Sequence, residues 1–246
     1  SKKEERTWLL KPPRDGERHD VVLYLGCNVL RTSHLVETVG AVFDRLGLDY
    51  VAAGGPTYCC GIQHHRRGQE ASGERYANHT VELLQSMAPR EVVMWCPSCI
   101  QFYDEVLQAE LPFPKRHTAE FLADCLDRGL FTFTRRVEAT VALHYHYATE
   151  ARAREVRAAR RLLEAVPGTE VKTVERCAGH DGTWGVKSEY FDNSMKIGRP
   201  VFRQMAEPSP AYVSSDCPIA ARHILQGMRE GGEAGKAVDR KSTRLN

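Results

Sequence analysis

Val21-Val-Leu-Tyr-Leu-Gly26 is a run of β-branched, aromatic and other apolar residues, and Cys27 follows it directly. Glu91-Val-Val-Met-Trp95 has a similar character and is followed by Cys96. Short continuous apolar runs are typical of strands that are buried on both faces of a parallel sheet. The two runs therefore predict buried strands, each of which carries a cysteine at its carboxyl end.

Amphipathic stretches separate these runs. From His34 to Leu46 apolar residues recur at helical spacing until Gly47 ends the pattern, and a second helix is expected over roughly 68–87. Tyr50-Val-Ala-Ala53 lies between the two helices and predicts a further strand. The alternation of strands and helices predicts an α/β fold, with a small parallel sheet flanked by helices as in Rossmann-like domains.

The second half of the chain repeats this plan. Its segment AYVSSDCPIAARHILQG (211–227) is the counterpart of VVMWCPSCIQFYDEVLQ (92–108). We predict two tandem pseudo-repeats, residues 20–133 and 138–232, and one continuous domain is the alternative. The elements expected in the second repeat are strands at Thr140–Tyr145, Glu170–Val174 and Ala211–Ser215 and helices at about 149–165 and about 187–205.

Both ends of the chain have features of a non-native sequence. The chain begins at Ser1 without an initiator Met, and residues 239–246 resemble the in-frame translation of a sequencing adapter. We therefore expect 239–246 to be a non-native tail, and the natural protein to continue past one or both ends.

The bulk composition narrows the classes of function. The 246 residues are 42% hydrophobic and 27% charged, with a net charge of +2, so a nucleic-acid surface has no compositional support. No apolar run approaches the roughly eighteen residues that span a bilayer, and no signal peptide is visible. We expect a cytoplasmic protein that reaches the inner face of a membrane only through a partner. In that compartment the eight cysteines indicate metal binding or catalysis rather than disulfides.

Five cysteines form a pattern that chance placement does not explain. Thirty-one residues separate Cys27 from the adjacent pair Cys59-Cys60, and thirty-five separate the pair from Cys96-Pro-Ser-Cys99. We call these five residues the five-thiol set. Because the carboxyl ends of parallel strands meet at one edge of a sheet, the thiols are expected to gather there. Soft thiolates select iron–sulfur clusters, zinc or Cu(I), and zinc takes only four ligands, so a fifth thiol favours an iron–sulfur cluster.

The spacing, with Gly61 directly after the pair, resembles the cysteine-rich CCG domain family. This domain occurs in the B subunit of heterodisulfide reductase and in the iron–sulfur subunits of glycolate oxidase, lactate-utilisation systems and anaerobic glycerol-3-phosphate dehydrogenase. The resemblance covers about residues 20–230 as two copies. It implies that Cys27, Cys59, Cys60, Cys96 and Cys99 are the cofactor-binding and metal-binding residues of a non-cubane [4Fe–4S] cluster, and it identifies no catalytic residue.

The second repeat departs from the family's pattern. The counterpart of Cys27 is Tyr147, the cysteine pair becomes Cys177-Ala178, and the last element keeps only Cys217. A cluster with five thiolates cannot be built from two thiols, which puts in doubt a heterodisulfide reductase with two working clusters.

Histidines nevertheless fall near the two surviving cysteines in the predicted topology, at His144, His146 and His180. A second metal site at Cys177, His180 and Cys217 is therefore one hypothesis, because thiolate and imidazole together suit zinc or a degenerate iron site. The alternatives are leftover thiols beside core histidines, and a substrate or redox pocket.

The resemblance implies an iron–sulfur electron-transfer subunit or domain of a multi-subunit oxidoreductase. The complex would be a flavin-linked dehydrogenase of the glycerol-3-phosphate, glycolate or lactate type. Its implied partners are a flavoprotein dehydrogenase that carries FAD and a ferredoxin-like subunit or domain. Two alternatives stay open: a catalytic subunit of the heterodisulfide reductase type that reduces a small disulfide, and a zinc-stabilised structural module.

Overall fold

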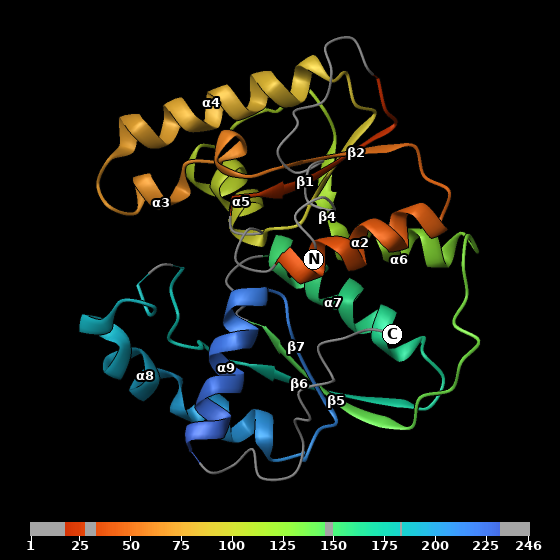
Figure 1. Ribbon diagram of the computed structural model, residues 1–246, viewed down its shortest axis with the longest axis vertical. Coiled ribbons are helices and arrows are strands. Elements are labelled where there is room, and N and C mark those ends of the chain that lie inside the picture. The colour runs from red at the N-terminus through yellow and green to blue at the C-terminus, as the bar shows by residue number, and fades with distance from the viewer. Residues whose placement is uncertain (1–17, 28–32, 146–149, 183, 232–246) are drawn as a thin grey trace. The chain divides into compact units, whose positions relative to one another are not determined.

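The chain folds around two parallel β-sheets, each with helices packed beside it (Figure 1). The computed structural model describes residues 18–27, 33–145, 150–182 and 184–231, so the tail expected at 239–246 lies outside the described residues. The chain divides into two compact units, Ser1–Phe121 and Leu122–Asn246, each of which contains one of the sheets.

The first unit has a four-stranded sheet in the order β2-β1-β3-β4, with every neighbouring pair parallel. The central strand β1 is buried along its whole length, as its unbroken apolar run predicts. The strands are β1 (Val21–Gly26), β2 (Tyr50–Gly54), β3 (Glu91–Met94) and β4 (Lys115–His117).

Helical segments connect these strands, as parallel pairing requires. The longest, α4 (Glu70–Ser86), buries one stripe that consists of Gly73, Ala77, Thr80 and Leu84, spaced to fall on a single helix face. The others are α2 (Ser33–Arg45), η3 (Pro56–Tyr58), α3 (Ile62–His65), α5 (Pro97–Gln101) and the π-helical turn η4 (Phe102–Val106). Helix α6 (Thr118–Asp127) follows the last of these strands and contains the boundary between the two units.

One core cluster of the first unit lies between α4 and the strands β1 and β3. Tyr24, Met94, Phe102 and Tyr103 are its largest fully buried side chains together with Leu84. Cys60 and Cys99 belong to the same core. The apolar centre of this unit therefore extends to the cysteine pattern.

The second unit has a three-stranded parallel sheet in the order β6-β5-β7. Its core includes Phe202, which lies in a notch formed by Gly198 and Gly227, where an added Cβ would approach the ring to 2.3 Å and 2.2 Å. Its elements are β5 (Ala139–Tyr145), α7 (Glu150–Glu164), β6 (Thr169–Glu175), α8 (Ser188–Ala206), β7 (Tyr212–Ser215) and α9 (Pro218–Glu230).

The predicted α/β class with two small parallel sheets is confirmed, and the predicted strands and long helices lie within one or two residues of the observed ones. In both sheets the first strand of the unit is central and the next two strands flank it. This shared order is what a tandem duplication would produce, although the repeat bounds 20–133 and 138–232 stay a prediction.

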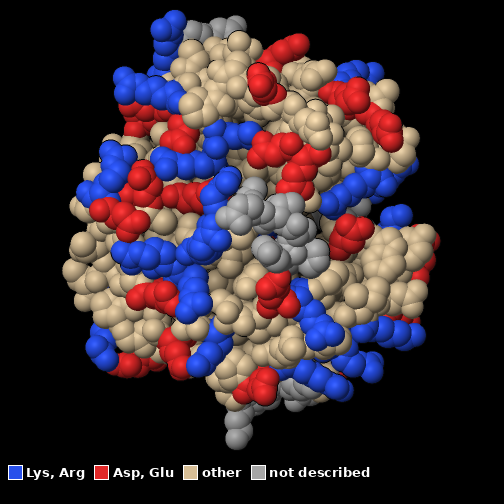
Figure 2. All heavy atoms as spheres, turned by 180° about the vertical axis from the view of Figure 1, so that it is seen from behind, with Lys and Arg blue, Asp and Glu red and all other residues tan. Residues whose placement is uncertain are grey.

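One face of the molecule shows mixed charge. On the face shown in Figure 2, Lys and Arg side chains are interspersed with Asp and Glu side chains rather than gathered into a field of one sign. Among the described helices, none is both long enough and apolar enough to pass through a lipid bilayer.

Candidate metal centre

The five-thiol set lies where the first sheet's strands end. Cys27 directly follows β1, the pair Cys59-Cys60 follows β2 and the short turn η3, and Cys96 follows β3 after Trp95 and caps α5 at its amino end. Cys99 sits one turn into α5. The three strand ends thus deliver the cysteines to one edge, as the sequence predicts for a parallel sheet.

The thiols of the five-thiol set contact one another in two groups. The sulfur atoms of Cys27 and Cys59 are 3.9 Å apart, and the Cys99 thiol is hydrogen-bonded to the thiols of both Cys60 and Cys96. All eight cysteines of the chain are free thiols. Cys60 and Cys99 are buried, whereas Cys27, Cys59 and Cys96 are half-buried. The set therefore has a buried part and a part that solvent reaches.

The pKa values of these thiols are shifted because the thiols interact with one another. Hydrogen bonding to Cys59, burial and the neighbouring thiols raise the pKa of Cys27. Cys59 has its pKa lowered to about 6, first by the hydrogen bond from Cys27 and then by the Gly61 N–H and the nearby imidazole of His64, against the effect of burial. The pKa of Cys99 is raised by its hydrogen bonds to Cys60 and Cys96 and by burial. Because thiolates at this spacing repel one another, the whole set can ionise only beside positive charge, which metal ions supply.

The spread of the sulfurs bears on the kind of metal group. Among the residues that the structure describes, no three His, Cys, Asp or Glu side chains are arranged as ligands of one metal ion. The five thiols form two sets in contact, Cys27 with Cys59, and Cys99 with Cys60 and Cys96. A cluster binds different thiolates to different iron atoms, so both sets could serve one cluster.

Two buried tyrosines lie beside the set. Burial and the charges of Cys99 and Cys60 raise the pKa of Tyr24, and burial and the same two thiols raise that of Tyr103. The Tyr24 hydroxyl donates to the Tyr58 carbonyl at 2.8 Å. These aromatic side chains place part of the five-thiol set in an apolar environment.

Helix α4 contacts the loop that carries the cysteine pair. The Thr80 hydroxyl donates to the Cys59 carbonyl at 2.8 Å. Gly61 has φ +89°, and a Cβ there would lie 2.1 Å from the carbonyl oxygen of Gly73 in α4. The glycine after the pair is thus required twice, for its backbone conformation and for the close approach of the helix.

Sequence reasoning missed Tyr24, Thr80, Tyr103 and the Gly61–Gly73 contact. In the sequence, Tyr24 is one of several apolar residues in a predicted strand, and Thr80 is one of several polar residues in a predicted amphipathic helix. Their roles depend on hydrogen bonds to carbonyls that are 34 and 21 residues away. No local pattern reports such bonds.

The corresponding edge of the second sheet holds polar side chains. His144 is buried at the end of β5, with Nε2 2.7 Å from the Arg176 carbonyl and Nδ1 3.0 Å from the Ser215 hydroxyl. Both ring nitrogens therefore have partners within the protein, as in a core histidine. His146 and Tyr147 lie outside the described residues.

The two surviving cysteines have different settings. Cys177 is exposed and accepts the Gly179 N–H at 3.4 Å, whereas Cys217 is half-buried and caps α9. His180 is buried with its ring 5.4 Å from that of His223. The second metal site at Cys177, His180 and Cys217 stays a prediction.

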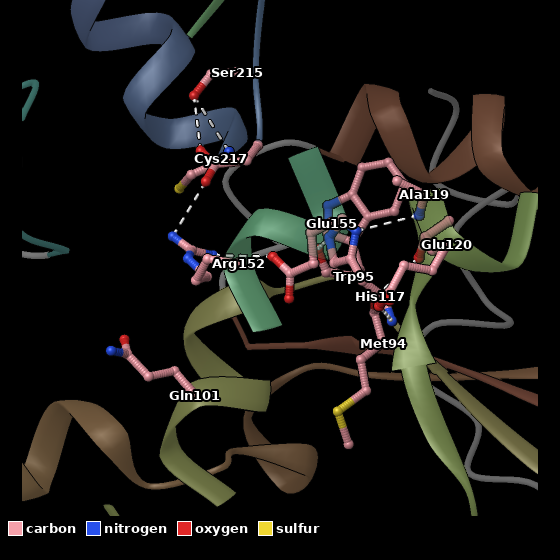
Figure 3. A network of polar contacts seen from close by, with 12 residues as sticks. Met94, Trp95, Gln101, His117, Ala119, Glu120, Arg152, Glu155, Ser215 and Cys217 are labelled. Atoms are coloured by element: carbon pink, nitrogen blue, oxygen red, sulfur yellow. Dashed lines mark hydrogen bonds and ion pairs between the residues drawn. The ribbon is translucent and has the colours of Figure 1, made fainter. Parts of the chain in front are cut away.

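An ion pair lies next to Cys217. The Arg152 guanidinium is 3.2 Å from one carboxylate oxygen of Asp216 and 3.3 Å from Glu155, and the Ser215 hydroxyl donates to the other oxygen of Asp216 at 3.2 Å (Figure 3). The side chains of Arg152, Asp216 and Glu155 are 12%, 6% and 2% exposed. A polar network thus occupies the strand end that matches the one bearing Cys96 in the first unit.

Comparison with known proteins agrees with this geometry. Residues 21–102 match the family model of the cysteine-rich CCG domain. The D subunit of dihydromethanophenazine:CoB–CoM heterodisulfide reductase from Methanosarcina barkeri is 25% identical over 239 residues, which cover 92% of this chain and 58% of that protein. EtfAB:quinone oxidoreductase of Syntrophomonas wolfei is 21% identical over 244 residues, 92% of this chain and 34% of that protein.

A third relative matches over a shorter stretch. The C subunit of anaerobic glycerol-3-phosphate dehydrogenase from Escherichia coli is 40% identical over 57 residues, 23% of this chain and 14% of that protein. The chain spans less than two thirds of the length of each of these relatives. By their names all three are oxidoreductases or subunits of them. Residues 21–102 of the first unit therefore match the cysteine-rich CCG domain, in a chain that is similar to the D subunit of heterodisulfide reductase and, over a shorter stretch, to the C subunit of anaerobic glycerol-3-phosphate dehydrogenase.

Proposed function

We propose that this chain is an iron–sulfur electron-transfer subunit or domain of a multi-subunit oxidoreductase. The five-thiol set would hold one non-cubane [4Fe–4S] cluster, which accepts and donates single electrons when bound. The observation that carries the proposal is that five free thiols, two of them buried, lie in two contacting sets at the carboxyl edge of one parallel sheet.

The residues around the thiols support this role. Tyr24 and Tyr103 limit water on the buried side, which keeps a bound cluster from hydrolysis and holds the sulfurs in place. The Gly61 N–H donates to the Cys59 sulfur, and such hydrogen bonds tune the reduction potential of a cluster. The half-buried Cys27, Cys59 and Cys96 leave part of the site open to a redox partner.

An electron-transfer role also implies partner proteins. Electron transfer by one cluster needs a donor and an acceptor, and we propose a flavoprotein dehydrogenase that carries FAD and a ferredoxin-like subunit or domain. The relatives' names support a multi-subunit setting, because two of them are single subunits of a reductase and a dehydrogenase.

A second candidate function is the reduction of a small disulfide. The heterodisulfide reductase relative, which matches 92% of this chain, favours it, as does the accessible part of the five-thiol set. In this reaction two electrons and two protons convert one disulfide into two thiols, and the cluster would pass the electrons singly. The test is release of thiols from a heterodisulfide by the anaerobic chain with a reduced artificial electron donor.

Metal analysis of the anaerobically purified chain tests the main proposal. We expect a brown protein with about four irons per chain. Replacing both Cys59 and Cys60 by Ser should remove most of the iron, because two ligands, one of them buried, are lost together.

Cys177→Ser is the matched control, since this cysteine is exposed and lies in the second unit. It should keep the iron content of the unmodified chain. A colourless protein with stoichiometric zinc would instead indicate the zinc-stabilised structural module.

A further inference from the structure

We propose that Tyr24 and Thr80 are positioning residues, which fix the two peptide carbonyls that flank Cys59 and so hold the cysteine pair in the geometry that its cluster needs. The inference rests on the proposed function, since the cluster is the group that these residues would serve. Neither residue contributes a metal ligand of its own.

The first carbonyl belongs to Tyr58, directly before the pair. It accepts the Tyr24 hydroxyl at 2.8 Å, and Tyr24 is fully buried. A buried carbonyl that loses its donor costs free energy, so the loop is expected to move if the hydroxyl is removed. Tyr24 lies three residues before Cys27 on β1. One strand therefore places Cys27 and also fixes the backbone next to Cys59.

The second carbonyl belongs to Cys59 itself. It accepts the hydroxyl of Thr80 at 2.8 Å, and Thr80 is also fully buried. Thr80 lies on the same buried stripe of α4 as Gly73, whose backbone packs against Gly61. The helix thus contacts the loop on both sides of Cys60.

Together these bonds determine which way the amide groups point. A peptide unit is planar and trans, so its N–H lies opposite its carbonyl. Fixing the carbonyls of Tyr58 and Cys59 therefore fixes the N–H groups of Cys59 and Cys60. The Gly61 N–H, one residue further on, donates to the Cys59 sulfur. The two hydroxyls consequently fix the orientation of the peptide units on both sides of Cys59, and with them the position of the Cys59 side chain.

The second unit repeats one of the bonds and not the other. His144 lies three residues before Tyr147, and its Nε2 is 2.7 Å from the carbonyl of Arg176, the residue before Cys177. The bond from the central strand is thus present in both units. The helix hydroxyl of the second unit, Ser194, instead donates to the carbonyl of Gly179 at 2.7 Å. A hydrogen bond from a helix hydroxyl to a cysteine carbonyl is thus found in the first unit, where both cysteines of the pair are present, and Ser194 does not make it in the second unit, where only Cys177 remains.

The test compares Thr80→Val and Tyr24→Phe in the full, anaerobically purified chain. Each variant keeps its side-chain shape and loses one hydroxyl. We expect iron release to a chelator to be about fivefold faster or more, as the loss of one buried hydrogen bond implies. The electron paramagnetic resonance spectrum of the cluster should change as well, because the sulfur geometry changes. Thr80→Ser, which keeps a hydroxyl, should restore the rate and the spectrum.

Thr169→Val in the second unit and Tyr50→Phe in the first are matched controls. The Thr169 hydroxyl donates to the Leu163 carbonyl at 2.6 Å, and the Tyr50 hydroxyl lies 2.9 Å from the Asp44 carboxylate and 3.2 Å from the Gly40 carbonyl, away from all five thiols. These controls should lower the thermal stability by similar amounts and leave the iron release and the spectrum unchanged.

The outcomes separate the two proposals. If the wild-type chain binds iron but its Thr80→Val and Tyr24→Phe variants behave like the controls, this inference alone is overturned. It is also overturned if Thr80→Ser does not restore the wild-type iron release and spectrum. A wild-type chain that binds no iron after reconstitution would overturn the proposed function and this inference together.

Discussion

Gly61 illustrates at the residue scale how little freedom the cysteine loop has. Its φ of +89° is one that residues with a side chain rarely adopt, and the space where a Cβ would go is taken by the backbone of Gly73. The contact with Gly73 restricts this position more severely than the φ angle does, because a backbone carbonyl in a helix cannot rotate away as a flexible side chain can. The loop therefore tolerates only glycine here on two independent physical grounds.

We predict that Gly61→Ala destabilises the chain by about 2–5 kcal/mol, from about 1–2 for the left-handed conformation and about 1–3 for the overpacked contact. Denaturant unfolding measures this change in free energy. Gly68→Ala is the control, because Gly68 has φ +75° and nothing within 4 Å of its added Cβ. It should show the conformational cost alone, and equal losses in the two variants would contradict the role of the Gly73 contact.

At the element scale, the packing of α8 against α9 depends on two glycines around one aromatic ring. Phe202 of α8 is 3% exposed, and its ring lies between Gly198 and Gly227 and 5.5 Å from the ring of His223. With neighbours on several sides the ring cannot move aside. The missing side chain of Gly198 leaves room for the ring along α8, and that of Gly227 lets α9 approach the ring.

Gly227→Ala should therefore destabilise the protein by about 1–3 kcal/mol, although an alanine normally stabilises a helix interior relative to glycine. Adding Phe202→Leu should recover much of this loss, because the smaller side chain removes the clash. The measurement is the free energy of unfolding of the two single variants and the double variant. Gly40→Ala in α2, where the nearest atom is a tyrosine hydroxyl at 3.4 Å, should have the ordinary, stabilising sign.

The elements that sequence reasoning found are those with a periodic signal. The apolar run of β1 and the helical spacing in α4 were sufficient to place both elements. Strand β4 was missed, because its residues Lys115, Arg116 and His117 are polar and it forms an edge of the sheet, where no alternation is needed. The π-helical turn after α5 was also missed. It is defined by a hydrogen bond from the Leu107 N–H to the Phe102 carbonyl, five residues earlier, and no residue pattern in the sequence indicates such a bond.

At the scale of the whole molecule, the chain has two sheets, each with a core of its own. The spacing of the cysteines was sufficient to predict which strand ends come together in the first unit. It could not predict what replaces the thiols in the second, because the ion pair of Arg152 with Asp216 joins residues 64 positions apart through the fold. The candidate site was thus predictable as a set of ligands, and its supporting contacts were not.

Removal of the proposed cluster should affect the two units differently. We expect a chelator to increase backbone hydrogen exchange in β1, β2 and β3, whose carboxyl ends carry the ligands, and to leave β5, β6 and β7 unchanged. Hydrogen–deuterium exchange with peptide-level mass spectrometry makes this comparison. A similar increase in both sheets would show that the metal stabilises the chain as a single cooperative body.

The uneven burial of the cysteines has a practical consequence. Water touches Cys27, Cys59 and Cys96 but scarcely reaches Cys60 or Cys99. An inorganic cofactor there would meet its surroundings through the wetted sulfurs, so the path open to an incoming electron is also open to dioxygen. A redox protein docked over these sulfurs would then both transfer electrons and block the access of dioxygen. The isolated chain should therefore be handled under anaerobic conditions.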